Sequence, residues 1–203
     1  MSAEVVVLRF GARRVPRALS GLPVHDVGAP TDVDPLVGAG RMIVVGGLAD
    51  LGTVLTRLLR ADRLDVEVGL VSRPWHARRA RTGAAKRVPL IRDETGTVVT
   101  GAAYWLPTDE DARTISGEGV VDDVLLFDGE VTGVRVEPTA DLPGLRASVL
   151  TGRMRPRRWV TGRAAQLGTT GALVVRDGVP APRPVRRSTF YRHTQGWLAV
   201  GSR

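Results

Sequence analysis

The sequence contains no cysteine, and its only lysine is Lys86. Without cysteine the chain forms no disulfide, no thiolate-ligated zinc site and no cysteine nucleophile. Histidine is also scarce, and the three histidines, His25, His76 and His193, lie too far apart in sequence to form a local metal-ligand motif. The sequence therefore predicts no metal site.

Aromatic residues and long apolar runs are rare as well. Aromatics make up 4% of the chain and hydrophobic residues 43%, which is typical of an aliphatic α/β or β core. No apolar run approaches the roughly 18–20 residues that cross a bilayer, so we expect no transmembrane segment. Residues 1–10 include Glu4 and Arg9 and lack both a basic n-region and a small-residue cleavage site. This pattern is not that of a signal peptide, and we expect a cytoplasmic protein.

The clearest local pattern lies between residues 41 and 60. The apolar run 41–45 predicts a buried strand, and Gly46 and Gly47 follow it directly. Apolar residues then recur at helical spacing over 51–60, which predicts a helix with Asp50 as its N-cap. Backbone N–H groups and the helix dipole converge at such a turn, so it is a candidate site for a phosphate.

The pattern of the chain changes near residues 83–87. Before this point, strand-like and helix-like segments alternate, with residues 28–40 expected as a loop. After it, short β-like runs are separated by turn signals. We predict a small Rossmann-like α/β domain over residues 1–85, followed by a β-sandwich-like domain over 86–203. The expected strands of the second part include 120–127 and 197–200, and its expected turns are 93–96, 128–129, 143–144 and 177–178.

The chain is arginine-rich and carries a formal net charge of +8. The basic residues cluster in 73–87 and 153–163. Such clusters contact the phosphates of nucleic acid or an anionic lipid surface, or else they are solvated arginines on surface loops. The sequence shows no helix-turn-helix, zinc finger or aromatic RNA-binding motif beside them. A weak contact with a polyanion or an anionic lipid surface therefore stays open.

Candidate catalytic groups are few. The spacing from Gly47 to Gly52 and Thr53 has the outline of a P-loop, but no lysine precedes Thr53 to reach a nucleotide's phosphates. A looser phosphate turn and a purely structural turn both remain open. The acidic residues at 109–111 predict a solvated loop. Of the neighbouring pair Asp122 and Asp123, alternation along an expected strand would point one inward, so Asp123 joins Asp50 as a candidate catalytic residue.

Two segments resemble the core of the diacylglycerol kinase and lipid kinase family, whose relatives include NAD kinase. That family has an apolar strand ending in Gly-Gly-Asp-Gly-Thr, then a helix, then a second strand that leads to a proline-containing nucleotide loop. Gly46 and Gly47 match the first two glycines, and Gly52 and Thr53 echo the last two motif residues after an insertion that includes Asp50. Residues 70–77, with Arg73, fall where the family has its Pro-x-Gly-Thr-x-Asn-Asp-x-Ala loop.

The resemblance implies ATP and Mg²⁺ as cofactors, and Gly46, Gly47, Asp50, Gly52, Thr53 and Arg73 as cofactor-binding residues. Asp177 and Gly178 form a late turn like the family's Asp-Gly-Glu turn, but Val179 replaces the glutamate. The motif aspartate is displaced, and the Gly-Thr-x-Asn-Asp sequence is absent. The chain thus looks like a short, degenerate member, and we expect a non-catalytic protein, a pseudo-enzyme that binds a nucleotide, a phosphate or a partner. An active lipid kinase or NAD kinase-like phosphotransferase is one alternative, and a basic protein of nucleic acid or anionic membranes is another.

Overall fold

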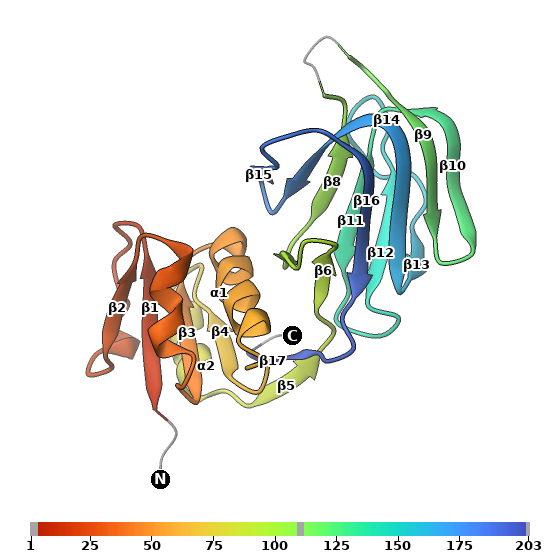
Figure 1. Cartoon of the computed structure of the whole chain (residues 1–203). Coiled ribbons are helices and arrows are strands. Elements are labelled where there is room, and N and C mark those ends of the chain that lie inside the picture. Colours follow the sequence, from red (N-terminus) through yellow and green to blue (C-terminus); the bar gives the residue numbers. More distant parts are fainter. Residues whose placement is uncertain (1–3, 109–111, 202–203) are drawn as a thin grey trace. The chain divides into compact units, whose positions relative to one another are not determined.

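The computed structural model describes residues 4–108 and 112–201 (Figure 1). The chain forms two compact units. The first contains the chain up to Val88 together with the segment from Gln195 onward, and the second runs from Pro89 to Thr194. The acidic cluster at 109–111, for which the sequence predicts a solvated loop, lies outside the described residues.

Within the described residues, the first unit is built on a six-stranded sheet with the order β2-β1-β3-β4-β17-β5. The first five strands in this order run parallel, and β5 at the edge runs antiparallel to β17. The apolar strand expected at 41–45 is β3 with the same bounds. The strands are β1 (Val5–Phe10), β2 (Val24–Val27), β3 (Arg41–Val45), β4 (Glu67–Leu70), β5 (Ala85–Val88) and β17 (Trp197–Val200).

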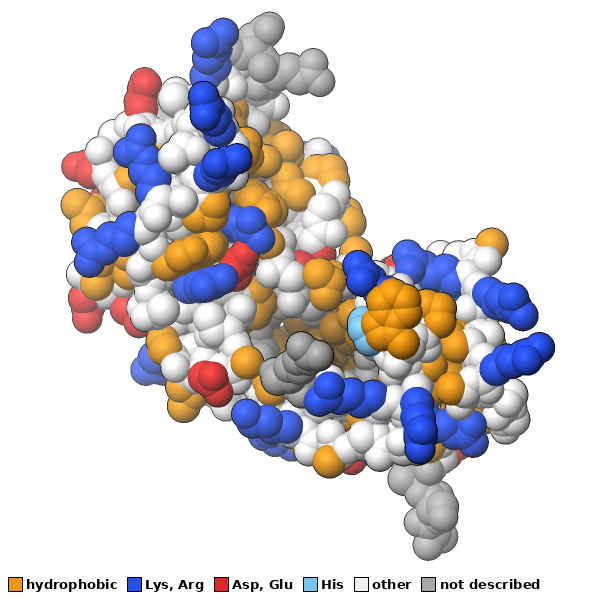
Figure 2. All heavy atoms as spheres, turned by 180° about the vertical axis from the view of Figure 1, so that it is seen from behind, with side chains coloured by type: hydrophobic (Ala, Val, Ile, Leu, Met, Phe, Trp, Pro, Cys, Tyr) orange, Lys and Arg blue, Asp and Glu red, His pale blue; other side chains and the backbone are white. Residues whose placement is uncertain are grey.

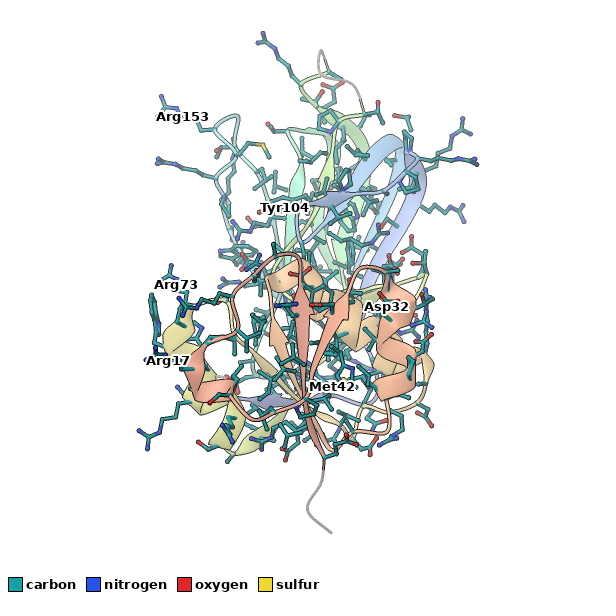
Figure 3. All side chains as sticks on the ribbon, turned by 90° about the vertical axis from the view of Figure 1, so that its left-hand side faces the viewer. Arg17, Asp32, Met42, Arg73, Tyr104 and Arg153 are labelled. Atoms are coloured by element: carbon teal, nitrogen blue, oxygen red, sulfur yellow. The ribbon has the colours of Figure 1, made fainter. Side chains whose placement is uncertain are left out.

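Helices cover both faces of this sheet. On one face, α2 (Ala77–Thr82) and the short 3-10 helix η1 (Arg17–Leu19) pack against alternate residues of the strands, including Ile43 and Val45. α1 (Leu48–Arg60) and η2 (Pro30–Leu36) lie on the opposite side, where Figure 3 places Asp32 away from Arg17 and Arg73. The strands therefore have two buried faces, as a doubly covered parallel sheet requires.

The segment 28–40 is not a simple loop as the sequence predicts, because it contains η2. The Asp32 carboxylate accepts hydrogen bonds from the backbone N–H groups of Ala29 (2.8 Å) and Gly28 (2.9 Å), which organises the start of this helix. The same hydrogen bonds, the one from Ala29 first, lower the pKa of Asp32. The basic segment after β4 contains two short helices, η3 (Pro74–His76) and then α2.

The second unit is an antiparallel, β-sandwich-like body, as the sequence predicts. Its described residues form an eleven-stranded sheet with the main order β13-β12-β11-β8-β14-β16-β6-β7. Trp105 and Phe190 stack in its core with ring centroids 5.7 Å apart, and both side chains are fully buried. The strands are β6 (Ile91–Asp93), β7 (Val98–Val99), β8 (Ala103–Leu106), β9 (Ile115–Val121), β10 (Val124–Val131), β11 (Val134–Pro138), β12 (Leu145–Val149), β13 (Val160–Gly162), β14 (Ala164–Arg176), β15 (Val179–Pro180) and β16 (Val185–Arg192).

Two turns of this unit differ from the sequence-based prediction. Residues 120–127 are not one strand, because Asp122 and Asp123 form the turn between β9 and β10, with Asp122 at a φ of 50°. Asp128 and Gly129, expected as a turn, instead lie inside β10 and pair with β9. The hairpin therefore turns at Asp122 and Asp123, and the Asp128-Gly129 pair does not form a turn.

The C-terminal strand also differs from the expectation that it belongs to the β-rich part. β17 lies between β4 and β5 in the sheet of the first unit, with Ala199 opposite Val68 and Lys86. A short apolar segment has the same sequence pattern whichever sheet it joins, so its sequence does not reveal which strands it pairs with. In the described part of the chain, no helix is long and apolar enough to span a membrane.

Candidate nucleotide site in the first unit

The carboxyl ends of the parallel strands meet at one edge of the first unit. The chain proceeds from β1 to β2 on one side and from β3 to β4 on the other, so the strand order reverses between β1 and β3. Open α/β sheets bind ligands in the crevice at such a reversal. The loop after β1, residues 11–14, and the Gly46-Gly47 turn after β3 border this point.

The Gly46-Gly47 turn joins β3 directly to α1, as the sequence predicts, but the helix starts earlier. α1 begins at Leu48 with Gly47 as its N-cap, so Asp50 is the third helical residue and not the N-cap. The Asp50 carboxylate instead reaches back and accepts a hydrogen bond from the Gly47 N–H at 2.7 Å. This contact is one half of a capping box, since glycine offers no side chain for the other half.

Gly46 is buried and packs tightly against the same carboxylate. A β-carbon at Gly46 would lie 2.6 Å from Asp50 Oδ2 and 2.8 Å from Asp50 Cβ. The Gly46 N–H donates to the carbonyl of Val71 at 3.3 Å. Glycine is therefore required here by the close approach of Asp50, whose carboxylate stands where an external anion would meet the turn.

Gly52 and Thr53 do not belong to the turn, contrary to the expectation that they bind a cofactor. Both lie in the second turn of α1, where Gly52 is buried and Thr53 Oγ1 donates to the carbonyl of Ala49 at 3.1 Å. Because the helix begins at Leu48, their backbone groups lie inside the helix and not at its N-terminus.

Arg13 is a candidate binding residue that the sequence analysis missed. It lies in the exposed loop after β1, and its Nη2 is 3.9 Å from the position of a β-carbon at Gly47. No side-chain hydrogen bond or ion pair engages Arg13 within the described residues. The signal was present in the sequence: Arg13 and Arg14 follow Gly11 directly after a buried strand. Only the parallel pairing of β1 with β3 shows that this loop lies beside the turn after β3.

The ends of β1 and β2 carry a separate charged pair beside this loop. Arg9 Nε donates to Asp26 Oδ1 at 2.5 Å across the two strands. This hydrogen bond lowers the pKa of Asp26 and raises that of Arg9. A cavity of about 470 Å³ lies here, lined by the pair and by residues 11–12 and 27–28. Since Asp26 is neutralised by Arg9, the arginines of residues 11–14 determine the charge at this edge.

Arg73, which the sequence analysis selected, lies at the carboxyl end of β4 in an exposed segment. Its guanidinium carbon is 5.3 Å from the ring centroid of Trp75, whose side chain is 68% exposed. The Trp75 ring meets that of His76 edge to face at 5.9 Å, and Ser72 Oγ lies 3.3 Å from His76 Nδ1. Figure 3 shows Arg73 at the side of the first unit that carries Arg17.

A cavity of about 510 Å³ lies behind this segment, entirely within the first unit. Leu51 of the first turn of α1 contributes one wall, and Ser72, His76 and Arg79 another. Trp75, Ala80 and Gly201 also line it, and strands β4 and β17 supply the rest. Figure 2 shows a face on which basic side chains border an exposed apolar group beside a histidine. The cavity is within the range of sizes that accept a small organic ligand.

Among the described residues, the acidic side chains form no cluster that could hold a magnesium ion by itself. Asp123 lies exposed at the β9–β10 turn of the second unit, and Asp122 is also exposed, accepting backbone hydrogen bonds from Arg163 (2.9 Å) and Ala164 (2.9 Å). Neither side chain points inward, contrary to the expectation from alternation. In the described part of the chain, no three His, Asp or Glu side chains are grouped as metal ligands. The described residues therefore provide no ready-made set of ligands for the Mg²⁺ that the resemblance implies, and one or two carboxylates together with a nucleotide's phosphates would have to hold it.

Comparisons with known proteins agree with this architecture. No family model matches the sequence, and no curated protein matches it. Among solved structures, a diacylglycerol kinase from Bacillus anthracis superposes with a TM-score of 0.73 at 11% identity, covering 98% of each chain. An NAD kinase from Archaeoglobus fulgidus in complex with ATP gives 0.66 at 14% identity, covering 97% of this chain and 93% of that one. Yeast NADH kinase complexed with NADH gives 0.60 at 8% identity, covering 99% of this chain and 84% of that one.

The chain therefore has the fold of diacylglycerol kinase and NAD kinase, as the sequence resemblance implies. Identities of this size show the fold alone. The same fold supports unrelated functions on different sets of side chains, so function has to be argued from the residues at the crevice.

Proposed function

We propose that the first unit binds the phosphates of an adenine nucleotide at the crevice between β1 and β3, and that the protein does not transfer phosphate. The position of Arg13 carries this proposal. Its guanidinium lies at the point where the strand order reverses, beside Gly47 and without a partner in the described residues. The fold neighbours with bound ATP and NADH are consistent with a nucleotide as the ligand class.

The arginines, and not the turn, are the proposed phosphate ligands. The Gly46 and Gly47 N–H groups already donate to Val71 and to Asp50. A phosphate would also be repelled by the Asp50 carboxylate at the turn itself. Arg13 from the β1 loop and Arg73 from the β4 loop have planar guanidinium groups that pair with phosphate oxygens in a bidentate manner.

The base of the nucleotide would occupy the cavity next to Arg73. Trp75 presents an exposed ring, and the guanidinium of Arg73 already lies over it. Aromatic and guanidinium planes both stack on nucleobases, and the cavity of about 510 Å³ lies on the carboxyl side of β4. In this arrangement the phosphates lie toward Arg13 and the base lies toward Trp75.

The position of Asp50 supports the proposed lack of phosphate transfer. Phosphoryl transfer needs a metal ion on the nucleotide phosphates and a base for the acceptor hydroxyl, and carboxylates normally provide both. At the Gly46-Gly47 turn, Asp50 is held by its hydrogen bond to Gly47. In the alternative, an active kinase, Asp50 would have to exchange this contact for a metal ion.

Binding is tested by thermal unfolding and calorimetry with ATP, ADP and NAD. A nucleotide at about 100 times its Kd should stabilise the protein by about 2.7 kcal/mol. The variants Arg13→Ala and Arg73→Ala should each weaken binding by about tenfold, corresponding to the loss of one charge-assisted hydrogen bond. Arg60→Ala is the matched control, because Arg60 is exposed at the C-terminal end of α1, opposite the end that follows the Gly46-Gly47 turn. Equal binding by all four proteins would refute the proposed site.

Catalysis is tested separately with labelled ATP and Mg²⁺, using diacylglycerol, sphingoid and NAD acceptors. We expect no transfer above the control without protein. Transfer that disappears in Asp50→Asn would make the protein a kinase and Asp50 a metal ligand. Transfer that disappears in Asp123→Asn and survives Asp50→Asn would place the chemistry on the second unit.

A further inference from the structure

The outer face of the sheet in the second unit carries two arginine–aromatic stacks. The register places Arg135 of β11 opposite Tyr104 of β8, and the Arg135 guanidinium carbon lies 5.6 Å from the tyrosine ring centroid. On the strand next to β11, Arg146 of β12 lies 4.2 Å from the ring centroid of Trp159, which directly precedes β13. The stacks thus span β8, β11, β12 and β13, or roughly 14 Å at the usual strand spacing.

One carboxylate holds both stacks in place. Glu137 Oε1 pairs with Arg135 Nη2 at 2.5 Å, and Glu137 Oε2 pairs with Arg146 Nη2 at 2.6 Å. The Glu137 side chain is 13% exposed, whereas those of Arg135 and Arg146 are 33% and 41% exposed. The three charges sum to +1, so the face keeps a positive charge while its guanidinium planes are fixed over the rings.

The loop that follows β12 adds four arginines, at 153, 155, 157 and 158, all of them exposed. None forms an ion pair or a side-chain hydrogen bond within the described part of the chain. The loop backbone is ordered by hydrogen bonds from Thr151 N to the Arg155 carbonyl (2.9 Å) and from Arg157 N to the Val149 carbonyl (3.1 Å). Figure 3 shows Arg153 projecting away from the second unit.

We propose that this surface, the outer face of β8-β11-β12-β13 with loop 151–159, binds single-stranded nucleic acid. Unpaired arginines attract phosphates, and guanidinium planes that are held over aromatic rings stack on unpaired bases of any sequence. The sequence alone does not bring Tyr104 and Trp159 together, because the two residues are distant along the chain and share one face only through strand pairing.

The same surface fits a bilayer less well. Binding to anionic membranes is strengthened by apolar side chains that enter the lipid, in addition to charge. In loop 151–159 the exposed large hydrophobic residue is Met154, at 47%. The rings of Tyr104 and Trp159 lie beneath guanidinium groups and are not free to insert.

The test measures binding of the full chain to fluorescein-labelled oligothymidylate of about twelve nucleotides, a length within the footprint of sheet-based single-strand binders. If the four loop arginines each neutralise one phosphate, the slope of log K against log salt is about −2.8. Affinity then falls about 50-fold between roughly 50 and 200 mM salt. The double variant Arg157→Ala/Arg158→Ala should reduce the slope to about −1.4.

Two further variants separate stacking from charge. Trp159→Leu keeps an apolar side chain but removes the stack, and should weaken binding roughly 5- to 150-fold with an unchanged salt slope. Arg186→Ala/Arg187→Ala removes the same charge from exposed positions of β16 and should change affinity less than about threefold, because distant charges are screened. Thermal unfolding of each variant confirms that it is folded. If Trp159→Leu fails to fold, the salt slope of Arg157→Ala/Arg158→Ala still tests the proposal.

Three results would overturn the proposal. The first is no binding of the oligonucleotide by the unmodified chain at about 50 mM salt. The second is an equal loss of affinity in the control pair on β16, which would reduce the effect to net charge. The third is binding to phosphatidylglycerol vesicles that the oligonucleotide does not displace, which would identify a membrane surface. A steep salt slope that only the loop variants reduce, together with weakened binding by Trp159→Leu, supports it.

Discussion

Asp93 shows how a single residue can organise a turn and a strand pair at once. Its side chain is fully buried, and Oδ1 accepts hydrogen bonds from Thr95 N (2.8 Å), Thr95 Oγ1 (2.7 Å) and Thr97 N (2.9 Å). Its other oxygen pairs with Arg176 Nε at 2.5 Å, so the β6–β7 turn is tied to β14. A buried charge of this kind is tolerated because its hydrogen-bonding and charge partners are present together.

We therefore expect Asp93→Ala to lower the free energy of unfolding by about 3–5 kcal/mol, because Arg176 would be left buried and unpaired. Urea unfolding of the variant and the parent chain measures this difference. Asp123→Ala is the matched control, since Asp123 is exposed and makes no side-chain contact in the described residues, and its effect should stay within about 0.5 kcal/mol. A loss below about 1 kcal/mol for Asp93→Ala would contradict the assigned role.

The sequence indicates the turn at Asp93 but not its partner. The Asp-Glu-Thr-Gly run predicts a turn at 93–96, and the structure has one between β6 and β7. Arg176, however, lies far along the chain, and one sequence contains no information on which strand will carry the opposing charge. For Asp177, too, the sequence indicates a turn but not the distant backbone groups that its side chain contacts. Its carboxylate also accepts hydrogen bonds from Gly101 N (2.7 Å) and Ala102 N (2.9 Å).

At the level of secondary structure, the junction of β3 and α1 was largely predictable. The bounds of β3 follow from its apolar run, and the apolar face of α1 follows from its helical periodicity. The start of α1 was placed too late, because an aspartate before an apolar run is typical of an N-cap. In the structure, Gly47 is the N-cap and has no side chain to contribute. Asp50 is the third helical residue, and its carboxylate accepts the hydrogen bond from the Gly47 N–H.

This junction predicts a specific coupling between Gly46 and Asp50. Gly46→Ala places a β-carbon 2.6 Å from Asp50 Oδ2 and should cost about 1–3 kcal/mol through overpacking. Asp50→Ala should cost about 1 kcal/mol, because the Gly47 N–H loses its acceptor. Asp50→Ala removes the carboxylate and keeps the Cβ, so it relieves part of the clash, and the double variant should be more stable than the sum of the two single effects predicts.

The double-mutant cycle is measured by denaturant unfolding of the four proteins. Gly38→Ala serves as the control, because a β-carbon at Gly38 meets no atom within 4 Å. That variant should be neutral or slightly stabilising through reduced entropy of the unfolded chain. Strict additivity of Gly46→Ala and Asp50→Ala would show that the two residues do not share this space.

At the scale of the whole chain, the first unit is completed by residues that follow the second unit in sequence. β17 inserts between β4 and β5, so the first sheet is continuous only after the C-terminal segment has paired. The composition change near 83–87 correctly marks where the pattern becomes β-rich, but it does not reveal the return of the chain. Long-range strand pairing of this kind is not encoded in local periodicity.

β17 enters the first sheet at a tightly packed glycine. Gly196 precedes β17, and a β-carbon there would lie 2.2 Å from the carbonyl oxygen of Val88 at the end of β5. Gly196→Ala should therefore separate β17 from β5 and destabilise the first unit by about 1–3 kcal/mol.

Hydrogen exchange measures the effect on each unit separately. The amides of β4 and β17 should exchange faster, while those of β14 remain unchanged. Gly152→Ala, in an open loop of the second unit, is the control and should leave both sets of amides as they are. Faster exchange throughout both units after Gly196→Ala would mean that they unfold as one cooperative body. Unchanged exchange in β4 and β17 would mean that the first sheet does not depend on its C-terminal strand.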